Sequence, residues 1–512
     1  MDDPVVSGTE ESEAVCAGNG GRIIPPCAIV IFGASGDLAG RKLFPALFQL
    51  YTTGSLPQSF TIVGAGRKKM DAASFRAFVF GSLNQQPSLD RSVRQEFIEH
   101  FFYQELLYDE QEGYARLAAN LASLDRQNGT GGNRIFYLAV PPETYPVIGK
   151  MLGQVGLSRE NENGNGFCRI VVEKPFGRDL ESAVALDEIL HASFAEHQIF
   201  RIDHYLAKEK VQNILMFRFA NAIFEPIWNR SYIDYIGIIA AEKLGVEHRA
   251  GYYEQSGVIR DMFQNHMMQL LALTAMEPPS VFSPDRVQDE KVKVFRALKP
   301  FAESGPEENL ILGQYGAGQI DGSAVPAYRE EEGVAPGSLT PTFAMLRLFI
   351  DNWRWQGVPF YVASGKRLAE KITRIVIQFK EVPNSIFRYL LGESFQANRL
   401  VLSIYPQEEI HLTFQAKVPG ARICMQTVTM QFAYGWKKPA LDAYAKVLVD
   451  CIEGDHMLFW RRDGVEQTWS FLDPVLVGCE NCSARMELLH PYASGSWGPA
   501  ESMAWMERIR GE

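Results

Sequence analysis

The chain has 512 residues, of which 46% are hydrophobic and 22% are charged. This length and amino-acid composition are typical of about two to four folded domains and exclude a disordered, collagen-like or coiled-coil protein. The 50 Lys and Arg against 61 Asp and Glu give a formal charge of −11, so the overall field repels nucleic acid and anionic lipid, and neither is expected as a partner.

The first 26 residues carry scattered acidic side chains among Ser and Gly and lack the basic start and apolar stretch of a signal peptide. We interpret residues 1–26 as a flexible acidic tail. No apolar run is long enough for a membrane helix. The seven cysteines are an odd number, which suits reduced thiols, so a cytoplasmic location is expected. Cys479 and Cys482 have CxxC spacing, but no second pair follows, and no metal site is predicted.

The ordered part begins with an apolar run at 27–32, typical of a strand buried on both faces of a parallel sheet. Leucines at helical spacing follow from Lys42, and residues 61–67 supply a second strand, which completes a β-α-β unit. Further strands are expected at 135–140, 170–172 and 199–202, with a helix at 182–194. Residues 27–203 are therefore predicted to form an α/β, Rossmann-like domain with a parallel sheet.

The pattern changes after residue 203. Segments with roughly alternating polarity follow one another without intervening helices, as antiparallel strands do, at 372–379, 399–405, 409–414 and 424–432. Gly, Ser, Glu and Pro dominate residues 302–342, which indicates a long connection on the surface. We expect residues 204–512 to form a larger α+β domain with a mainly antiparallel sheet, which binds substrate and supports oligomerisation.

A glycine-rich turn follows the first strand and precedes the first helix. In this context glycines allow backbone N–H groups to approach a pyrophosphate at a helix N-terminus. The Gly-x-x-Gly spacing departs from GxGxxG, so an ordinary tight turn is the alternative. The residues predicted to hold a dinucleotide here are Gly33, Ala34, Ser35, Gly36, Asp37 and Leu38.

The second strand ends in Arg67-Lys68-Lys69, where NAD-preferring sites carry an Asp or Glu for the ribose 2′-hydroxyl. Cations at this place suit a 2′-phosphate, so the predicted cofactor is NADP. Ser35 can add a hydroxyl donor to the same phosphate, and Lys42 can face the phosphates or the substrate. A solvated surface cation is the alternative interpretation of Arg67.

Two further motifs lie at the ends of later strands: EKPFG at 173–177 and RIDHYLAKE at 201–209. Open α/β sheets bind their ligands at this edge. Together with GASGDLA at 33–39, these motifs resemble the glucose-6-phosphate dehydrogenase family in order and spacing, over nearly the whole chain. The resemblance implies that a homodimer or homotetramer oxidises D-glucose 6-phosphate at C1 to 6-phospho-D-glucono-1,5-lactone, with hydride transfer to NADP, as the first step of the oxidative pentose phosphate pathway.

Oxidation of a sugar hydroxyl needs a base for the O–H proton, and a histidine with a carboxylate partner is a common arrangement. His266 is the candidate. On an α-helix Asp261 would lie roughly 140° around the axis from His266, too far to share a hydrogen bond. The resemblance instead implies that Asp203 orients His266 and that Asp261 binds a substrate hydroxyl. Because apolar residues follow His266, a buried core histidine is the alternative.

The resemblance implies roles for a second group of residues. His204, Tyr205 and Lys208 would hold the sugar phosphate, to which an imidazole, a phenol and an ammonium are suited. Lys174 would contact both substrate and nicotinamide, and its bond to Pro175 is predicted to be cis. The remaining residues implied are Glu242, Lys366 and Lys371 at the sugar and Tyr145 at the cofactor.

The chain departs from the family pattern at two places. Ala207 stands where the motif usually has glycine. Mammalian members hold a second NADP through basic residues, and that second site is predicted to be absent or built differently here, because the corresponding positions are Ala363, Ile372 and Val376.

Two other functions are alternatives to this one. An oxidoreductase of the inositol dehydrogenase type also joins a Rossmann domain to an open antiparallel sheet, but the motif at 201–209 argues against it. A catalytically dead NADP-binding sensor or scaffold would be favoured only without Asp203, Lys208 or His266, and all three residues are present.

Overall fold

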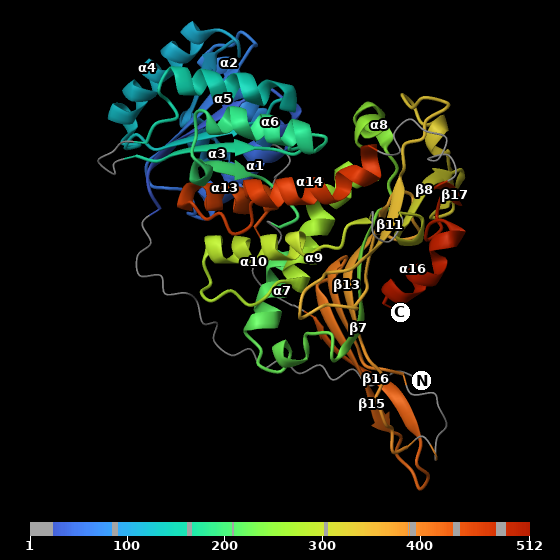
Figure 1. Ribbon diagram of the computed structural model, residues 1–512. Coiled ribbons are helices and arrows are strands. Elements are labelled where there is room, and N and C mark those ends of the chain that lie inside the picture. The colour runs from blue at the N-terminus through green and yellow to red at the C-terminus, as the bar shows by residue number, and fades with distance from the viewer. Residues whose placement is uncertain are drawn as a thin grey trace.

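The computed structural model describes residues 24–83, 91–160, 166–206, 209–301, 306–387, 389, 396–433, 441–477 and 488–511. Ala207, Lys208, Cys479, Cys482 and residues 1–23 of the predicted tail lie outside these ranges. Two large sheets, one parallel and one mixed, carry the fold of the described residues (Figure 1).

The first sheet has six parallel strands in the order β3-β2-β1-β4-β5-β6. The strands are β1 (Cys27–Phe32), β2 (Phe60–Gly66), β3 (Phe101–Glu105), β4 (Arg134–Leu138), β5 (Cys168–Val172) and β6 (Ile199–Arg201). The order reverses between β1 and β4, which is the place where doubly wound sheets bind ligands. This confirms the predicted Rossmann-like sheet, and β3 is a strand that the sequence pattern missed.

Helices cover both faces of this sheet, because its strands are apolar on both sides. They are α1 (Phe44–Thr52), α2 (Ala72–Ser82), α3 (Arg91–Glu99), α4 (Gln111–Asn128), α5 (Tyr145–Gln154) and α6 (Leu180–His191), joined from the far end of the chain by α13 (Ala443–Glu453).

The second sheet has nine strands in the order β16-β15-β14-β13-β7-β12-β11-β8-β17. Only β7–β12 and β8–β17 pair in parallel, so the predicted α+β region with a mainly antiparallel sheet is confirmed. In Figure 1 the hairpin of β15 and β16 extends away from the body. The strands are β7 (Ile233–Ala241), β8 (Leu310–Gly316), β11 (Phe343–Leu348), β12 (Phe360–Gly365), β13 (Ile372–Phe379), β14 (Arg399–Tyr405), β15 (Glu409–Lys417), β16 (Met425–Ala433) and β17 (Leu489–Ala493).

The surface connection predicted at 302–342 is wrong at 310–316. β8 lies inside the second sheet between β11 and β17, and its residues Leu310 and Leu312 are buried. A short apolar run therefore outweighs the glycine-rich composition around it, because burial is decided residue by residue. The small hairpin of β9 (Gly318–Ile320) and β10 (Ser323–Val325) stands apart from the two large sheets.

A further group of helices packs around the mixed sheet, with α10 and α14 beneath the parallel sheet and α16 on the opposite face of the mixed one (Figure 1). Helix α14 contacts α6 on one side and α10 and the π-helix η7 on the other, so it links the two halves of the chain. These helices are α7 (Glu209–Phe219), α8 (Ala250–Val258), η7 (Ile259–Met267), α9 (Met268–Ala275), α10 (Pro284–Arg296), α14 (Arg462–Val477) and α16 (Met503–Ile509).

Arg201, the last residue of β6, fixes the strand end that leads into the motif at 201–209. Its buried guanidinium donates to Asp187 Oδ1 at 2.5 Å and to Glu196 Oε1 at 2.8 Å. Its carbonyl oxygen accepts from the backbone N–H of Trp460 at 3.0 Å, just before α14. Arg201 therefore combines a buried ion pair near β6 with hydrogen bonds to Trp460, a residue more than 250 positions later in the chain.

Replacing Arg201 by methionine should destabilise the protein by about 3–5 kcal/mol, because Asp187 is left as an uncompensated buried charge. Urea or thermal denaturation measures the loss. Arg462→Ala removes an arginine whose bond to Glu466 is more exposed, and should cost less than about 1 kcal/mol. Equal losses in the two variants would contradict the anchoring role of Arg201.

Candidate active site

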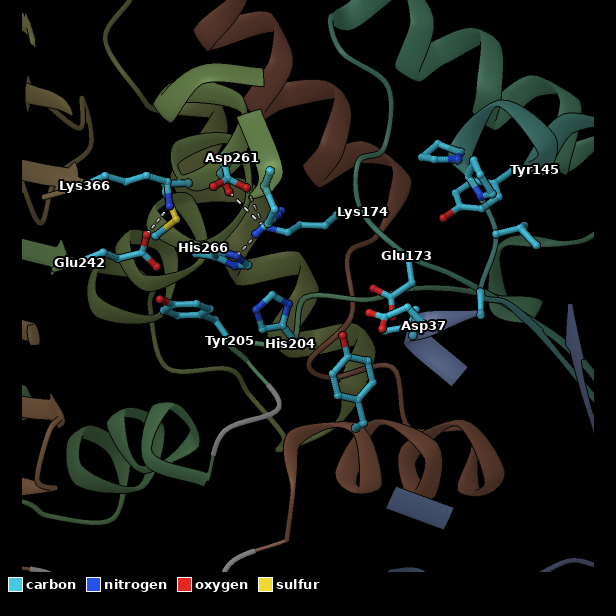
Figure 2. Close-up of a pocket in the computed structure, with 18 residues that line it drawn as sticks. Asp37, Tyr145, Glu173, Lys174, His204, Tyr205, Glu242, Asp261, His266 and Lys366 are labelled. Atoms are coloured by element: carbon cyan, nitrogen blue, oxygen red, sulfur yellow. Dashed lines mark hydrogen bonds and ion pairs between the residues drawn. The ribbon is translucent and has the colours of Figure 1, made fainter. Parts of the chain in front are cut away.

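A cavity of about 590 Å³ lies at the carboxyl edge of the parallel sheet (Figure 2). Its walls come from the segments after β1, β4, β5 and β6, from the ends of β7 and β12, and from η7. The carboxyl ends of parallel strands meet at one edge, so motifs far apart in the sequence converge here.

Most of the predicted site residues reach this cavity, and several lining residues were not predicted. The predicted residues that line it are Asp37, Leu38, Tyr145, Lys174, His204, Tyr205, Glu242, Asp261, His266 and Lys366. The main residues missed are Glu173, Arg249, Met262 and Tyr444. Only Glu173 carried a signal, because it begins the EKPFG motif.

His266 lines the cavity and is hydrogen-bonded to Asp203, a buried residue that does not itself line it. His266 Nδ1 lies 2.6 Å from Asp203 Oδ1, and the two side chains are 1% and 0% exposed. A carboxylate only accepts hydrogen bonds, so Nδ1 carries the proton and Nε2 keeps its lone pair. The backbone N–H of Tyr205 donates to the same Asp203 oxygen at 2.9 Å, and the Tyr205 ring stacks on the imidazole at 4.1 Å.

The electrostatics of this pair favour a neutral histidine beside an ionised aspartate. Burial opposes ionisation of Asp203, but the His266 imidazole holds the pKa of that carboxyl well below its usual range. Burial lowers the pKa of His266, and the charge of Lys174 lowers it further against the opposing effect of Asp203. Near neutral pH His266 can therefore accept a proton at Nε2.

Lys174 connects the histidine to Asp261 (Figure 2). Its Nζ lies 3.0 Å from His266 Nε2 and 3.3 Å from Asp261 Oδ1. Burial works against the ammonium, but Asp261 raises the pKa of Lys174 above its ordinary value, so it stays a cation. Burial also works against the Asp261 carboxylate, yet Lys174 lowers its pKa to about 2. The Lys174–Pro175 bond is cis, as predicted.

The helix that carries Asp261 and His266 differs from the one assumed from the sequence. Residues Ile259–Met267 form a π-helix, η7, in which hydrogen bonds join residues five apart. Asp261 and His266 are five apart, so the π-helix turns both toward Lys174 instead of separating them. Asp261 still does not bind His266, since Asp203 holds that ring, but the α-helical geometry behind the expectation was wrong.

Lys366 and Glu242 form a second charged pair in the cavity wall (Figure 2). Their Nζ and Oε2 atoms lie 2.5 Å apart. β7 and β12 are parallel neighbours that end in register at Ala241 and Gly365, so the next residue of each strand meets the other. Lys371 is exposed instead, with its ammonium 4.5 Å from the Tyr405 ring, and it is not among the lining residues of the cavity.

The glycine turn lies against the ends of β2 and β4. Gly33 has φ +78°, and a Cβ there would lie 2.2 Å from the carbonyl oxygen of Ala139. The N–H groups of Gly33 and Ala34 both donate to Ala65 O, at 2.8 and 3.4 Å. The turn therefore needs glycine at its first position, both for conformation and for space.

Ser35 and Arg67 stand at the end of β2, where a nucleotide ribose is expected. Ser35 Oγ lies 3.9 Å from the position that a Cβ on Gly66 would occupy, and Arg67 is exposed with its guanidinium 5.7 Å from the Tyr108 ring centre. A hydroxyl and a cation beside a glycine cradle fit a dinucleotide that carries a 2′-phosphate. Lys42 is exposed in the π-helical turn of Ala39–Leu43 and does not line the cavity.

Within the described ranges, no group of three or more His, Cys, Asp and Glu could hold a metal ion. None of the helices in these ranges is both long enough and apolar enough to cross a bilayer.

The fold and site define an oxidoreductase with a nicotinamide dinucleotide-binding domain. Family models described as the NAD binding domain and the C-terminal domain of glucose-6-phosphate dehydrogenase match residues 30–213 and 215–511. The chain belongs to the glucose-6-phosphate dehydrogenase family.

Similar proteins cover almost the whole chain. A glucose-6-phosphate 1-dehydrogenase from Aggregatibacter actinomycetemcomitans is 45% identical over 475 residues, 92% of this chain and 94% of that protein. One from Bacillus subtilis is 44% identical over 480 residues, 93% and 96% of the two chains. A solved structure titled as glucose-6-phosphate dehydrogenase with its substrate glucose-6-phosphate has a TM-score of 0.86 at 35% identity, covering 95% and 98%. The Mycobacterium avium enzyme has a TM-score of 0.79 at 32% identity, covering 94% and 97%.

Gly33→Ala should lower both the melting temperature and the affinity for dinucleotide, because the new methyl group meets the Ala139 carbonyl and the strained backbone. Gly54→Ala is the matched control, since Gly54 has φ +67° but nothing within 4 Å of the added Cβ. It should show only the conformational cost of about 1–2 kcal/mol and unchanged binding. Fluorescence titration with the reduced cofactor measures the difference, and equal behaviour of the variants would refute the close approach at Gly33.

Proposed function

We propose that this protein oxidises D-glucose 6-phosphate at C1 to 6-phospho-D-glucono-1,5-lactone and passes the hydride to NADP, the first step of the oxidative pentose phosphate pathway. His266 is the general base, and Asp203 orients it. The observation that carries the proposal is the buried Nδ1–H···Oδ1 bond, which leaves His266 Nε2 as an acceptor at the cavity. A related structure bound to glucose 6-phosphate supports the choice of substrate.

The proton transfer follows from the geometry at Nε2. The Lys174 ammonium holds this nitrogen at 3.0 Å, so the C1 hydroxyl of the sugar has to take its place. As the hydroxyl proton moves to Nε2, the ring becomes an imidazolium, and the Asp203 carboxylate stabilises that charge. The bound NADP supplies the acceptor for the hydride that leaves C1. The displaced Lys174 stays beside Asp261, and its charge favours the developing alkoxide oxygen.

The remaining polar residues of the cavity bind and orient the sugar. Glu242 and Asp261 offer carboxylate oxygens to sugar hydroxyls, and Lys366 holds Glu242 in place. His204 and Tyr205 line the cavity on the side of β6, where the sugar phosphate is proposed to bind. Lys208 and Lys371 remain proposed substrate ligands on the family motif alone, since Lys208 lies outside the described residues and Lys371 outside the cavity wall.

We also propose a division into an NADP-binding domain, 27–203, and a substrate and oligomerisation domain, 204–512. Family membership supports a homodimer or homotetramer that works in the cytoplasm. The charge of −11 supports the absence of nucleic-acid and membrane partners.

NADP preference is proposed to rest on Arg67 and Ser35. Arg67→Ala should weaken the binding of NADP by about 1.5–3 kcal/mol, roughly 10- to 150-fold. The binding of NAD should be nearly unchanged, because only NADP carries the 2′-phosphate. KM values for both cofactors measure the selectivity. Arg116→Ala, which removes an exposed arginine of α4, should leave both unchanged. An equal rise in KM for NAD and NADP in Arg67→Ala would show that Arg67 does not bind the 2′-phosphate.

His266→Asn should reduce kcat on the order of 10²–10⁴-fold and leave NADP affinity within a few-fold, because the amide cannot accept the proton. Asp203→Asn should reduce kcat in the same direction, since an amide no longer stabilises the imidazolium. The double variant should lose far less than the product of the two, because both residues serve one proton transfer. If the losses of kcat in the two single variants multiply in the double variant, or if kcat of His266→Asn is near normal, His266 is a buried core residue and not the base.

A further inference from the structure

The arginine that directly follows Lys366 is buried in an uncommon backbone conformation. Arg367 is 8% exposed and has φ +52°, in the left-handed region that residues other than glycine seldom adopt. Its N–H donates to Leu244 O at 3.2 Å, and its carbonyl oxygen accepts from the N–H of Gly495 at 2.8 Å. Such a conformation costs free energy and persists where the surrounding structure holds it in place.

The Arg367 guanidinium joins two acidic side chains from different segments. It lies 3.0 Å from Glu331 Oε1 and 3.3 Å from Glu247 Oε1. The same Glu331 oxygen accepts from the Tyr315 hydroxyl of β8 at 3.0 Å, so this carboxylate is fixed. Glu247 is half exposed and also has a left-handed backbone, with φ +48°. Arg367 therefore ties the exposed Glu247 to a more deeply buried anchor.

Glu247 belongs to the turn of residues 242–249, which leads from β7 to α8. The first and last residues of this turn, Glu242 and Arg249, both line the cavity. In its middle, a Cβ on Gly245 would lie 2.6 Å from Arg367 Nε, so the arginine side chain lies directly on the backbone of the turn. Arg367 therefore contacts the turn between the two residues that reach the cavity.

Lys366 meets the same turn from the end of β12. Its ammonium is bound to Glu242 Oε2 at 2.5 Å (Figure 2). Its N–H donates to Thr342 O at 3.0 Å, and its carbonyl oxygen accepts from the Tyr492 hydroxyl at 2.7 Å. These main-chain bonds fix the end of the strand, but they do not fix a flexible four-carbon side chain. The position of the turn that carries Glu242 therefore decides where the ammonium lies.

We propose that Arg367 is a positioning residue for the sugar: it holds the turn of residues 242–249 against the end of β12. The turn then presents Glu242 and Arg249 to the cavity and keeps Glu242 paired with Lys366. The proposal rests on the function proposed above, in which this end of the cavity binds glucose 6-phosphate. Arg367 does not line the cavity, so it acts through the turn and not on the substrate. A guanidinium suits this role, because its rigid fork can bind two carboxylates at once.

Arg367→Gln tests this role, because glutamine stays polar but lacks the charged fork. KM for glucose 6-phosphate should rise on the order of 10-fold, since sugar-binding groups that are no longer held in place must be ordered by the substrate. kcat should stay within a few-fold, because the hydrogen bond between His266 and Asp203 is untouched, and KM for NADP should be unchanged. Initial rates of NADPH formation at varied concentrations of each substrate measure all three constants.

Glu247→Gln breaks the same contact from its exposed side and leaves the pair of Arg367 and Glu331 intact. This variant should fold even if Arg367→Gln does not. It should raise KM for glucose 6-phosphate about threefold, a smaller effect because solvent partly screens the pair. Added to Arg367→Gln it should change KM no further, since both changes release the same turn. A wild-type KM in Glu247→Gln, or a full further rise in the double variant, overturns the proposal.

Arg134→Gln is the matched control. Arg134 is also 8% exposed and is paired with a carboxylate, that of Asp125, but it lies at the start of β4, at the opposite end of that strand from the cavity. Its loss should lower the melting temperature, as the loss of a buried ion pair does, and leave KM for glucose 6-phosphate unchanged. An unchanged KM in Arg367→Gln, or an equal rise in the Arg134 control, makes Arg367 a merely structural residue and overturns its positioning role.

The wild-type protein, measured in parallel, separates this failure from failure of the proposed function. If it forms NADPH from glucose 6-phosphate while KM stays at the wild-type value in Arg367→Gln and Glu247→Gln, the role of Arg367 alone is overturned. If it forms no NADPH from glucose 6-phosphate, the proposed function is overturned, and the role of Arg367 with it.

Discussion

The arrangement of the site depends on one buried hydrogen bond, from His266 Nδ1 to Asp203 Oδ1. Because the bond is shielded from water, it fixes the tautomer of the ring and directs the basic nitrogen at the cavity. Asp203 is held in turn by its place directly after β6, whose last residue Arg201 is anchored in a buried ion pair. Lys174 then meets the free nitrogen from the end of β5.

Charge balance explains how a protein of net charge −11 can hold an anionic sugar phosphate. The two lysines of the cavity each have a carboxylate close by: Lys174 has Asp261, and Lys366 has Glu242. These pairs keep several charges in a small, partly buried volume, and sugar hydroxyls can bind the same carboxylates. The site is therefore set up for a polar substrate before that substrate arrives.

The sequence predicts best where a local pattern decides the structure. The strands β1, β13 and β14 begin and end where the alternation or apolar run does, and Gly33 is required at the turn for local steric reasons. The π-helix that turns Asp261 and His266 toward Lys174 has no comparable local pattern, since it depends on packing. The same is true of Arg249 and Tyr444, which reach the cavity from segments outside every motif. The short buried strand β8 was not predicted, because the segments around it are rich in glycine.

The pH dependence of kcat/KM for glucose 6-phosphate tests the central claim most directly, because it reports the protonation of the free enzyme. His266 must be neutral to act as a base and its pKa lies below the usual 6.5, so the rate should fall only as the pH drops below about 6.5. The residual activity of His266→Asn should lack this acid limb. An acid limb of unchanged midpoint in His266→Asn would show that another group accepts the proton, and would contradict the account.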